Sequence, residues 1–123
     1  MARHLIAMLF LGIGILLALG ASAALAKTGF AVYYSDKYQG RQTANGEIFD
    51  QKIFTAAHNE LPYGTLVKVT NLENNHSVIV KINDRMAQNN PNIIDVSRRA
   101  AEKLGFIEQG RVSVTLETVK TRR

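Results

Sequence analysis

Cysteine is missing from all 123 residues of this chain. Disulfides, thiolate metal ligands, a cysteine nucleophile and a lipid anchor on an N-terminal cysteine are therefore excluded. The fold must be stabilised by packing alone, which favours a closed β-sheet over an open one with exposed edge strands.

Several common binding and catalytic signatures are missing as well. No serine lies in a Gly-x-Ser-x-Gly turn, and no glycine-rich phosphate loop is present. His58 has no second histidine at ligand spacing, because His76 falls in a polar turn, so we expect neither a metal nor another cofactor. The formal net charge is +5, but the basic residues are spread out and do not alternate with aromatic residues, which argues against nucleic-acid binding.

The one long apolar run lies near the start of the chain, at residues 5–19. A short basic segment precedes it and two small-x-small sites follow, the pattern of a signal peptide. We expect removal of residues 1–26, with cleavage after Ala23 as an alternative and an uncleaved membrane anchor as another. Residues 27–123 would then be one exported domain, periplasmic or secreted, soluble and monomeric, without stable membrane insertion.

Strand patterns dominate the remaining chain, and the predicted strands are 30–34, 53–57, 65–70, 77–83, 93–94 and 111–119. The third and fourth form a hairpin, with Asn74-Asn75 suited to its turn. One helix is predicted at 98–104, with Ser97 as N-cap and Gly105 as its stop. This pattern predicts a compact β-barrel or an α+β domain, and it leaves the order of the strands open.

The second hairpin strand ends in Asp84. Successive side chains alternate along a strand, so Val78, Val80 and Ile82 are predicted to share its face. An acid beside an apolar row resists ionisation and can act as a general acid near neutral pH. The alternative is an ordinary turn aspartate, since Asn-Asp also terminates strands.

Two polar clusters, residues 43–47 and 55–58, precede that strand. Glu47 follows a tight Asn-Gly turn, where a solvated turn residue is the alternative to a functional one. His58 follows an apolar run, so we expect it half sheltered at a strand end, with a structural hydrogen bond as the alternative role. Together with Asp84 and Asp95, these residues suit acid/base cleavage of glycosidic bonds.

Several motifs follow one another in a characteristic order: Tyr33-Tyr34, Gly40–Glu47, Thr55–His58, Leu61–Thr65, Val67–Leu72, Ser77–Arg85, Ile94–Ser97 and Ala100–Gly105. Together they resemble the rare lipoprotein A family of bacterial cell-wall enzymes. The resemblance implies a mainly β fold, a six-stranded double-psi β-barrel with one or two short helices, which expansins share. It also implies endolytic transglycosylase activity on peptidoglycan, with a preference for glycan strands stripped of stem peptides.

The resemblance also implies roles for single residues. The essential acid is Asp84, its partner histidine is His58, and the supporting glutamate is Glu47. Asp95 resembles the acid of expansin-like barrels, although we expect its side chain to tie down the helix that begins near Ser97. The residues expected to bind substrate are Tyr34, Thr43, Asn83, Arg85 and Asp95.

The implied reaction cleaves the bond between N-acetylmuramic acid and N-acetylglucosamine without water. Protonated Asp84 would donate to the glycosidic oxygen while the muramic C6 hydroxyl attacks C1 and closes a 1,6-anhydro ring. His58 is expected to position Asp84 or the sugar, and Glu47 to orient His58 or a sugar hydroxyl. All three are expected to share one hollow.

Two features depart from the family. Residues 86–91 replace its usual Gly-Pro-aromatic turn, and the lipid-attachment cysteine and C-terminal glycan-binding module of longer members have no counterpart here. We therefore expect a stand-alone catalytic barrel. Two alternatives stay open: a non-catalytic, expansin-like wall-binding module, and an exported partner-binding domain with Tyr33, Tyr34 and Tyr38 as contact residues.

Overall fold

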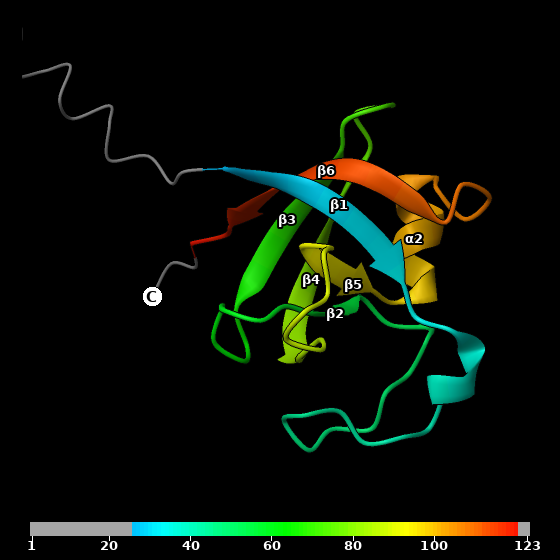
Figure 1. The fold of residues 1–123 in the computed structure, drawn as a ribbon, viewed down its shortest axis with the longest axis vertical. Helices are drawn as coiled ribbons and strands as arrows, with labels where there is room; N and C mark the ends of the chain where they lie inside the picture. Colours follow the sequence, from blue (N-terminus) through cyan, green and yellow to red (C-terminus); the bar gives the residue numbers. More distant parts are fainter. Residues whose placement is uncertain (1–25, 121–123) are drawn as a thin grey trace, which may run out of the picture.

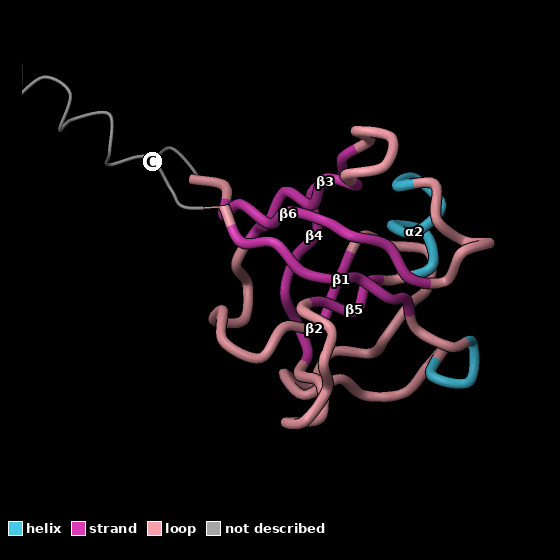
Figure 2. Tube along the Cα trace, turned by 45° about the horizontal axis from the view of Figure 1, so that its top comes forward, coloured by secondary structure: helices cyan, strands magenta, loops and turns pink. Residues whose placement is uncertain are grey.

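The computed structural model describes residues 26–120 and folds them into a closed six-stranded barrel (Figures 1 and 2). The strands are β1 (Lys27–Tyr33), β2 (Thr55–Ala57), β3 (Leu66–Asn71), β4 (Ser77–Asp84), β5 (Ile94–Val96) and β6 (Arg111–Thr118). A 3-10 helix, η1 (Asp36–Tyr38), follows β1, and an α-helix, α2 (Arg98–Leu104), lies between β5 and β6. The predicted leader ends at Ala26, so residues 1–25 of it lie outside the described part.

The strands follow one another around the barrel in the order β1-β5-β2-β4-β3-β6, and β6 pairs with β1 to close it. The pairs β1/β5 and β2/β4 are parallel, and the other four neighbouring pairs are antiparallel. Closure pairs both sides of every strand, which removes exposed edges in a domain without disulfides. The predicted mainly β barrel is confirmed.

Alternating apolar side chains fill the interior of the barrel. In β4, Val78, Val80 and Ile82 are buried, whereas Ser77 and Ile79 are exposed. Leu104 of α2 and Phe106 after it join the same core, so the helix covers one side of the barrel. Neither helical segment within residues 26–120 has the length and apolar character needed to cross a membrane.

The predicted helix is confirmed with both of its ends. The hydroxyl of Ser97 accepts a hydrogen bond from the N–H of Ala100, as an N-cap does. Gly105 follows the last turn with φ 78°, a left-handed conformation that glycine adopts without strain. The side chains that α2 buries are Ala100, Ala101 and Leu104.

The predicted hairpin is also confirmed, and its turn holds the end of α2. Asn75 has φ 65°, a left-handed conformation that asparagine tolerates. The side-chain amides of Asn71 and Asn74 donate to the carbonyl of Leu104 at 2.8 and 3.0 Å. A helix leaves its last carbonyls without internal partners, and here the hairpin supplies two donors to one of them.

Replacing Asn71 by alanine is expected to lower the free energy of unfolding by about 2 kcal/mol. The side chain is 1% exposed, donates to Leu104 and accepts from the N–H of Glu73, so its removal leaves buried groups unpaired. Urea denaturation measures the effect. Asn74→Ala, which removes an exposed donor to the same carbonyl, is the matched control and should cost less than half as much. Equal midpoints for Asn71→Ala and wild type would contradict this account.

The connections that carry most of the polar motifs gather at one end of the barrel. Figures 1 and 2 both show residues 34–54, 58–65 and 85–93 at this end, away from α2 and the hairpin turn. Each is longer than a tight turn, so these segments are free to shape a surface cleft. Segments from distant parts of the sequence are thereby brought together.

Candidate active site

Strand β4 changes register at Asn83. Ala56 of β2 pairs with Ile82, but the next residue, Ala57, pairs with Asp84, so Asn83 is an extra residue as in a β-bulge. A shift of one residue moves the side chains that follow to the opposite face of a strand. The prediction that Asp84 continues the buried apolar row is therefore wrong, and Asp84 lies beside Ala57 instead.

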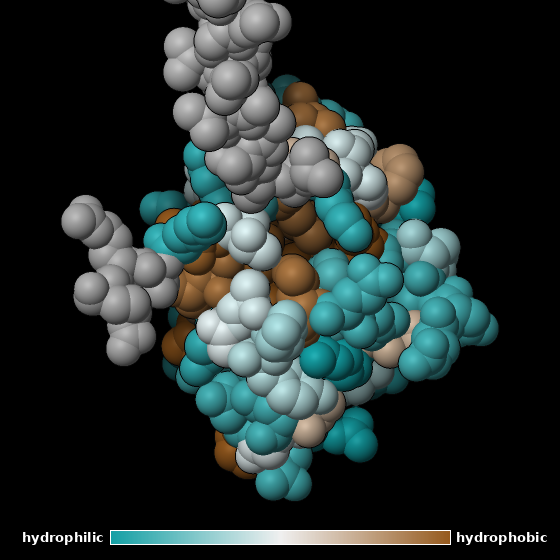
Figure 3. Space-filling view, turned by 90° about the vertical axis from the view of Figure 1, so that its left-hand side faces the viewer, coloured by the Kyte–Doolittle hydropathy of each residue, from teal (hydrophilic) through white to brown (hydrophobic). Residues whose placement is uncertain are grey.

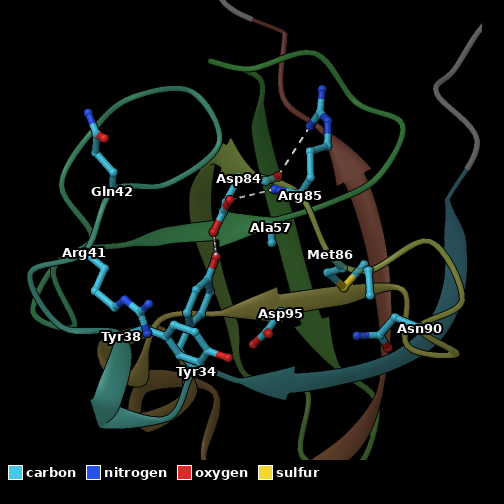
Figure 4. Close-up of a pocket in the computed structure, with 11 residues that line it drawn as sticks. Tyr34, Tyr38, Arg41, Gln42, Ala57, Asp84, Arg85, Met86, Asn90 and Asp95 are labelled. Atoms are coloured by element: carbon cyan, nitrogen blue, oxygen red, sulfur yellow. Dashed lines mark hydrogen bonds between the residues drawn. The ribbon is translucent and has the colours of Figure 1, made fainter.

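Ala57 lies between two aspartates. Strand β5 pairs it with Asp95 on the side away from Asp84, so the three residues lie next to one another on neighbouring strands (Figure 4). Neighbouring strands are about 4.8 Å apart, which places the two aspartate Cα atoms about 10 Å apart. The small side chain of Ala57 leaves the space between the two carboxyl groups open.

Both carboxyl groups line a cleft of about 410 Å³. Figure 4 shows Tyr38, Arg41 and Gln42 on one side of the aspartates, and Met86 and Asn90 on the other. The complete lining is Tyr34, Tyr38, Arg41, Gln42, Ala57, Asp84, Arg85, Met86, Ala87, Asn90 and Asp95. The cleft therefore combines two acids with hydrogen-bond donors from two loops.

Hydrogen-bond donors hold both oxygens of Asp84. Its Oδ2 accepts from the hydroxyl of Tyr34 at 2.6 Å, and its Oδ1 accepts from the backbone N–H groups of Ala44 and Arg85 at 2.8 and 2.9 Å. Tyr34 is buried and stacks on Phe49, with ring centres 4.1 Å apart. Burial, and then the hydrogen bond to Asp84, raise the pKa of Tyr34 well above its ordinary value, so the hydroxyl keeps the proton that it donates.

Asp95 has the desolvated environment that was predicted for Asp84. Its Oδ1 is buried and has no hydrogen-bond partner within residues 26–120. Burial, and in second place the negative charge of Asp84, raise the pKa of Asp95 from 3.8 to about 7. Of the two carboxyl groups, Asp95 is thus the one suited to carry a proton near neutral pH.

The start of α2 is held without Asp95. Ser97 caps the helix through Ala100, and the side-chain oxygen of Gln51 accepts from the N–H of Arg98 at 2.7 Å. Within the described part of the chain, no hydrogen bond joins the Asp95 side chain to this helix. The expected structural role of Asp95 is therefore wrong, because neighbouring polar groups already satisfy the helix terminus.

Glu47 joins the loop in front of Asp84 to strand β4, and no hydrogen bond connects it to His58 within residues 26–120. Its carboxylate accepts from the side chains of Asn83 and Lys81 at 3.0 and 3.2 Å. These two hydrogen bonds lower the pKa of Glu47 and keep it ionised. The expectation that Glu47 orients His58 is wrong, because the side chain turns toward β4.

The loop at residues 43–47 places a donor on Asp84. The hydroxyl of Thr43 donates to the Oδ1 of Asn45 at 2.7 Å, and the N–H of Asn45 donates to the carbonyl of Asn83 at 3.3 Å. This arrangement holds the N–H of Ala44 on the carboxylate. Thr43 and Asn83 are buried in this support and do not line the cleft, whereas three other residues predicted to bind substrate do: Tyr34, Arg85 and Asp95.

His58 is a neighbour of Asp84 along the backbone, but its side chain lies in a different hollow. Its N–H donates to the carbonyl of Asp84 at 3.1 Å, while its ring lines a second hollow of about 370 Å³. Met86 and Asn90 line both hollows and lie between them. The single shared hollow that we expected is thus divided into two adjoining ones.

The ring of His58 is held in one orientation. Its Nδ1 accepts hydrogen bonds from the backbone N–H groups of residues 60 and 61, at 3.0 and 3.1 Å. Burial lowers the pKa of His58, so the neutral ring is favoured. Arg85 also holds the segment that follows β2. Its guanidinium donates to the carbonyl of His58 and lies 4.0 Å from the ring centre of Tyr63.

Six residues that line the cleft were not predicted as site residues: Arg41, Gln42, Ala57, Met86, Ala87 and Asn90. Met86, in the segment that departs from the family, packs against the cluster of Tyr34, Phe49 and Ala57, and its N–H donates to the side chain of Asn59 at 2.7 Å. Ala57 belongs to a motif that we noted, but its role depends on pairing with two other strands. Within residues 26–120, no cluster of three His, Asp or Glu side chains could hold a metal ion.

Comparison with known proteins decides the family. A family model described as "Lytic transglycolase", for a double-psi β-barrel, matches residues 26–116. The chain belongs to this family. The resemblance inferred from the motifs is thereby confirmed.

Two relatives carry the name "Endolytic peptidoglycan transglycosylase RlpA". The one from Neisseria meningitidis is 46% identical over 97 residues, which cover 79% of this chain and 41% of the relative. The one from Rickettsia bellii is 47% identical over 100 residues, which cover 79% and 44%. The chain thus spans less than half the length of these relatives.

Solved structures share the fold at lower identity. The Streptomyces papain inhibitor has a TM-score of 0.64 and 24% identity, over 78% of this chain and 96% of that one. An expansin from Clavibacter michiganensis has a TM-score of 0.64 and 21% identity, over 80% and 52%. At this identity the likeness concerns the fold alone, and it supports the double-psi barrel.

Proposed function

We propose that residues 27–123 form the catalytic domain of a peptidoglycan lytic transglycosylase that acts outside the cytoplasm. It cleaves glycan strands endolytically between N-acetylmuramic acid and N-acetylglucosamine and leaves 1,6-anhydro ends. Membership of the family supports the reaction class, and the names of the relatives support the substrate. The observation that carries the proposal is a cleft with two carboxyl groups in opposite environments, one surrounded by donors and one desolvated.

Asp95 is the proton donor in this mechanism, in place of the Asp84 that the sequence favoured. Asp95 protonates the glycosidic oxygen, and the bond from that oxygen to C1 of the muramic acid breaks. The C6 hydroxyl of the same sugar attacks C1 and gives its proton to Asp84. Because the nucleophile belongs to the substrate, no bound water is needed for the attack. The proton returns from Asp84 to Asp95 through solvent before the next turnover.

The neighbours of Asp84 support its role as the base. The Ala44 and Arg85 N–H groups and the Tyr34 hydroxyl hold the carboxylate in one orientation. A base whose orientation is held in advance does not have to reorganise when the hydroxyl proton arrives. Its negative charge also favours the protonated form of Asp95, which is the state that a general acid needs.

The test is digestion of purified glycan strands free of stem peptides, followed by mass spectrometry of the new ends. The expected ends are 1,6-anhydro sugars, each lighter by one water molecule than a reducing end. Reducing ends would instead mean a hydrolase. Intact strands that bind the protein tightly would mean the non-catalytic wall-binding alternative, and would overturn the proposal.

A further inference from the structure

The second hollow adjoins the cleft across Met86 and Asn90 and has nearly the same volume, about 370 against 410 Å³. Three segments line it: the start of β1, the β2–β3 connection and the β4–β5 connection. The mechanism proposed above uses none of its side chains. A polymer that crosses the two aspartates in the direction of Asn90 would enter this hollow.

His58 lines this hollow and carries a hydrogen-bond donor in its neutral form. Two backbone N–H groups already occupy its Nδ1, so in the neutral ring the proton must lie on Nε2. Within residues 26–120, Nε2 has no hydrogen-bond partner, and it is not among the fully buried polar atoms that lack one. The Nε2–H group is therefore fixed in direction and reaches the surface, where His58 lines this hollow and a smaller one of about 90 Å³.

Amide groups supply the rest of its polar surface. Asn90 uses its Oδ1 for the backbone and side-chain amides of Asn92, and its own Nδ2 has no partner in the described part of the chain. Gln88 is exposed, and its side chain makes no hydrogen bond within residues 26–120. Amides both donate and accept, as sugar hydroxyl and acetamido groups do.

The charged and apolar side chains of the lining narrow the class of ligand further. The charged side chains in the lining, Lys27 and Glu60, lie 3.7 Å from each other, so these two charges oppose each other. Met86 and Ile93 add apolar surface. Figure 3 shows a similar mixture on the face seen from the left of Figure 1, with apolar surface gathered between hydrophilic areas.

We propose that this hollow is a second sugar subsite, which holds a neutral, N-acetylated sugar of the glycan strand next to the bond cleaved at the two aspartates. His58 donates its Nε2–H to an oxygen of that sugar, and Gln88 and Asn90 bind its polar groups. The proposal rests on the proposed function, and it assigns His58 to substrate binding.

The first test observes His58 directly by nitrogen-15 NMR of its ring. The free protein is expected to show the Nε2–H tautomer. Addition of a peptide-free glycan tetrasaccharide to Asp95→Asn, in which turnover is blocked, is expected to shift the Nε2 resonance and leave Nδ1 nearly unchanged. A ring protonated on Nδ1, or a ring unaffected by the sugar, would overturn the proposal. A response to muramyl dipeptide without a response to the tetrasaccharide would also overturn it.

The second test uses an exposed residue whose loss does not threaten the fold. Gln88→Ala is expected to raise KM for long glycan strands by roughly 2- to 10-fold, as loss of one hydrogen bond implies, with kcat unchanged. Gln109→Ala, an exposed glutamine outside every cleft described, is the matched control. An unchanged KM in Gln88→Ala would count against the subsite. If wild type releases no anhydro ends but the sugar still shifts His58, the proposed reaction fails while the subsite stands.

Discussion

Asp95→Asn is expected to lower the turnover of glycan strands by about 10²- to 10⁴-fold, the usual contribution of a general acid. Asparagine has nearly the same shape but no proton to give to the glycosidic oxygen. In wild type, kcat is expected to fall as the pH rises above about 7, because Asp95 loses its proton there. The residual kcat of the variant should not show this fall above pH 7.

The same substitution is expected to make the folded domain more stable at pH 8. In the unfolded chain Asp95 ionises near pH 4, whereas in the folded protein its pKa is about 7. Between these values the folded state binds more protons than the unfolded state, so the free energy of unfolding falls as the pH rises from 4 to 7 and then levels off. Asparagine does not ionise, so the variant avoids this loss. Its free energy of unfolding at pH 8 should be higher than that of wild type by roughly 2 kcal/mol, after a discount for partial exposure.

Denaturation of both proteins at pH 4 and pH 8, together with turnover assays, checks this pair of effects. Glu108→Gln removes an exposed carboxylate outside the cleft and is the matched control for charge. Full activity in Asp95→Asn would refute its role as the acid. Lost activity with lower stability at both pH values would indicate a structural residue instead.

Asp84→Asn is expected to reduce turnover by a similar factor of about 10²–10⁴, because the C6 hydroxyl loses its base. The fold should survive, since the asparagine oxygen can still accept from the N–H groups of Ala44 and Arg85. The variant also removes the negative charge that raises the pKa of Asp95. The pKa of Asp95 should therefore fall below 7, which carbon-13 NMR of its carboxyl group measures.

These results separate the two aspartates. Loss of turnover with a lowered pKa of Asp95 fits a base that also supports the acid. Wild-type digestion of glycan strands by Asp84→Asn would eliminate this residue from the mechanism. An unchanged pKa of Asp95 would contradict the proximity of the two groups, whatever the activity.

Local elements could be predicted because their determinants are local. Ser97 and Gly105 bound the helix through bonds within a few residues, and alternation set the buried row of β4 as far as Ile82. The double-psi barrel was implied by the resemblance to a known family that the motifs carry, and periodicity by itself left the strand order open. Asp84 was found, but its environment was misjudged, because the register shift at Asn83 has no signal in the alternating pattern.

The assignments that failed all depend on partners from distant segments. Glu47 was expected to orient His58, but the loop at residues 43–47 is hydrogen-bonded to the end of β4, and the carboxylate of Glu47 binds Lys81 and Asn83 there. His58 and Asp84 do meet along the backbone, yet Met86 and Asn90 divide their side chains between two hollows. The lengths and sequences of the connections between the strands decide how these side chains pack, and the spacing of residues in the sequence does not predict it.

By itself, then, the sequence determined the family, the local elements and the acidic residues from which chemistry could be drawn. Only the tertiary structure decided the environment of each acid. Ala57 of β2 pairs with Asp84 on one side and Asp95 on the other, which brings two charges together that are eleven positions apart. Desolvation, and in second place the charge of Asp84, then act on Asp95, whose Oδ1 is buried without a hydrogen-bond partner in residues 26–120, and burial is a property of the assembled barrel.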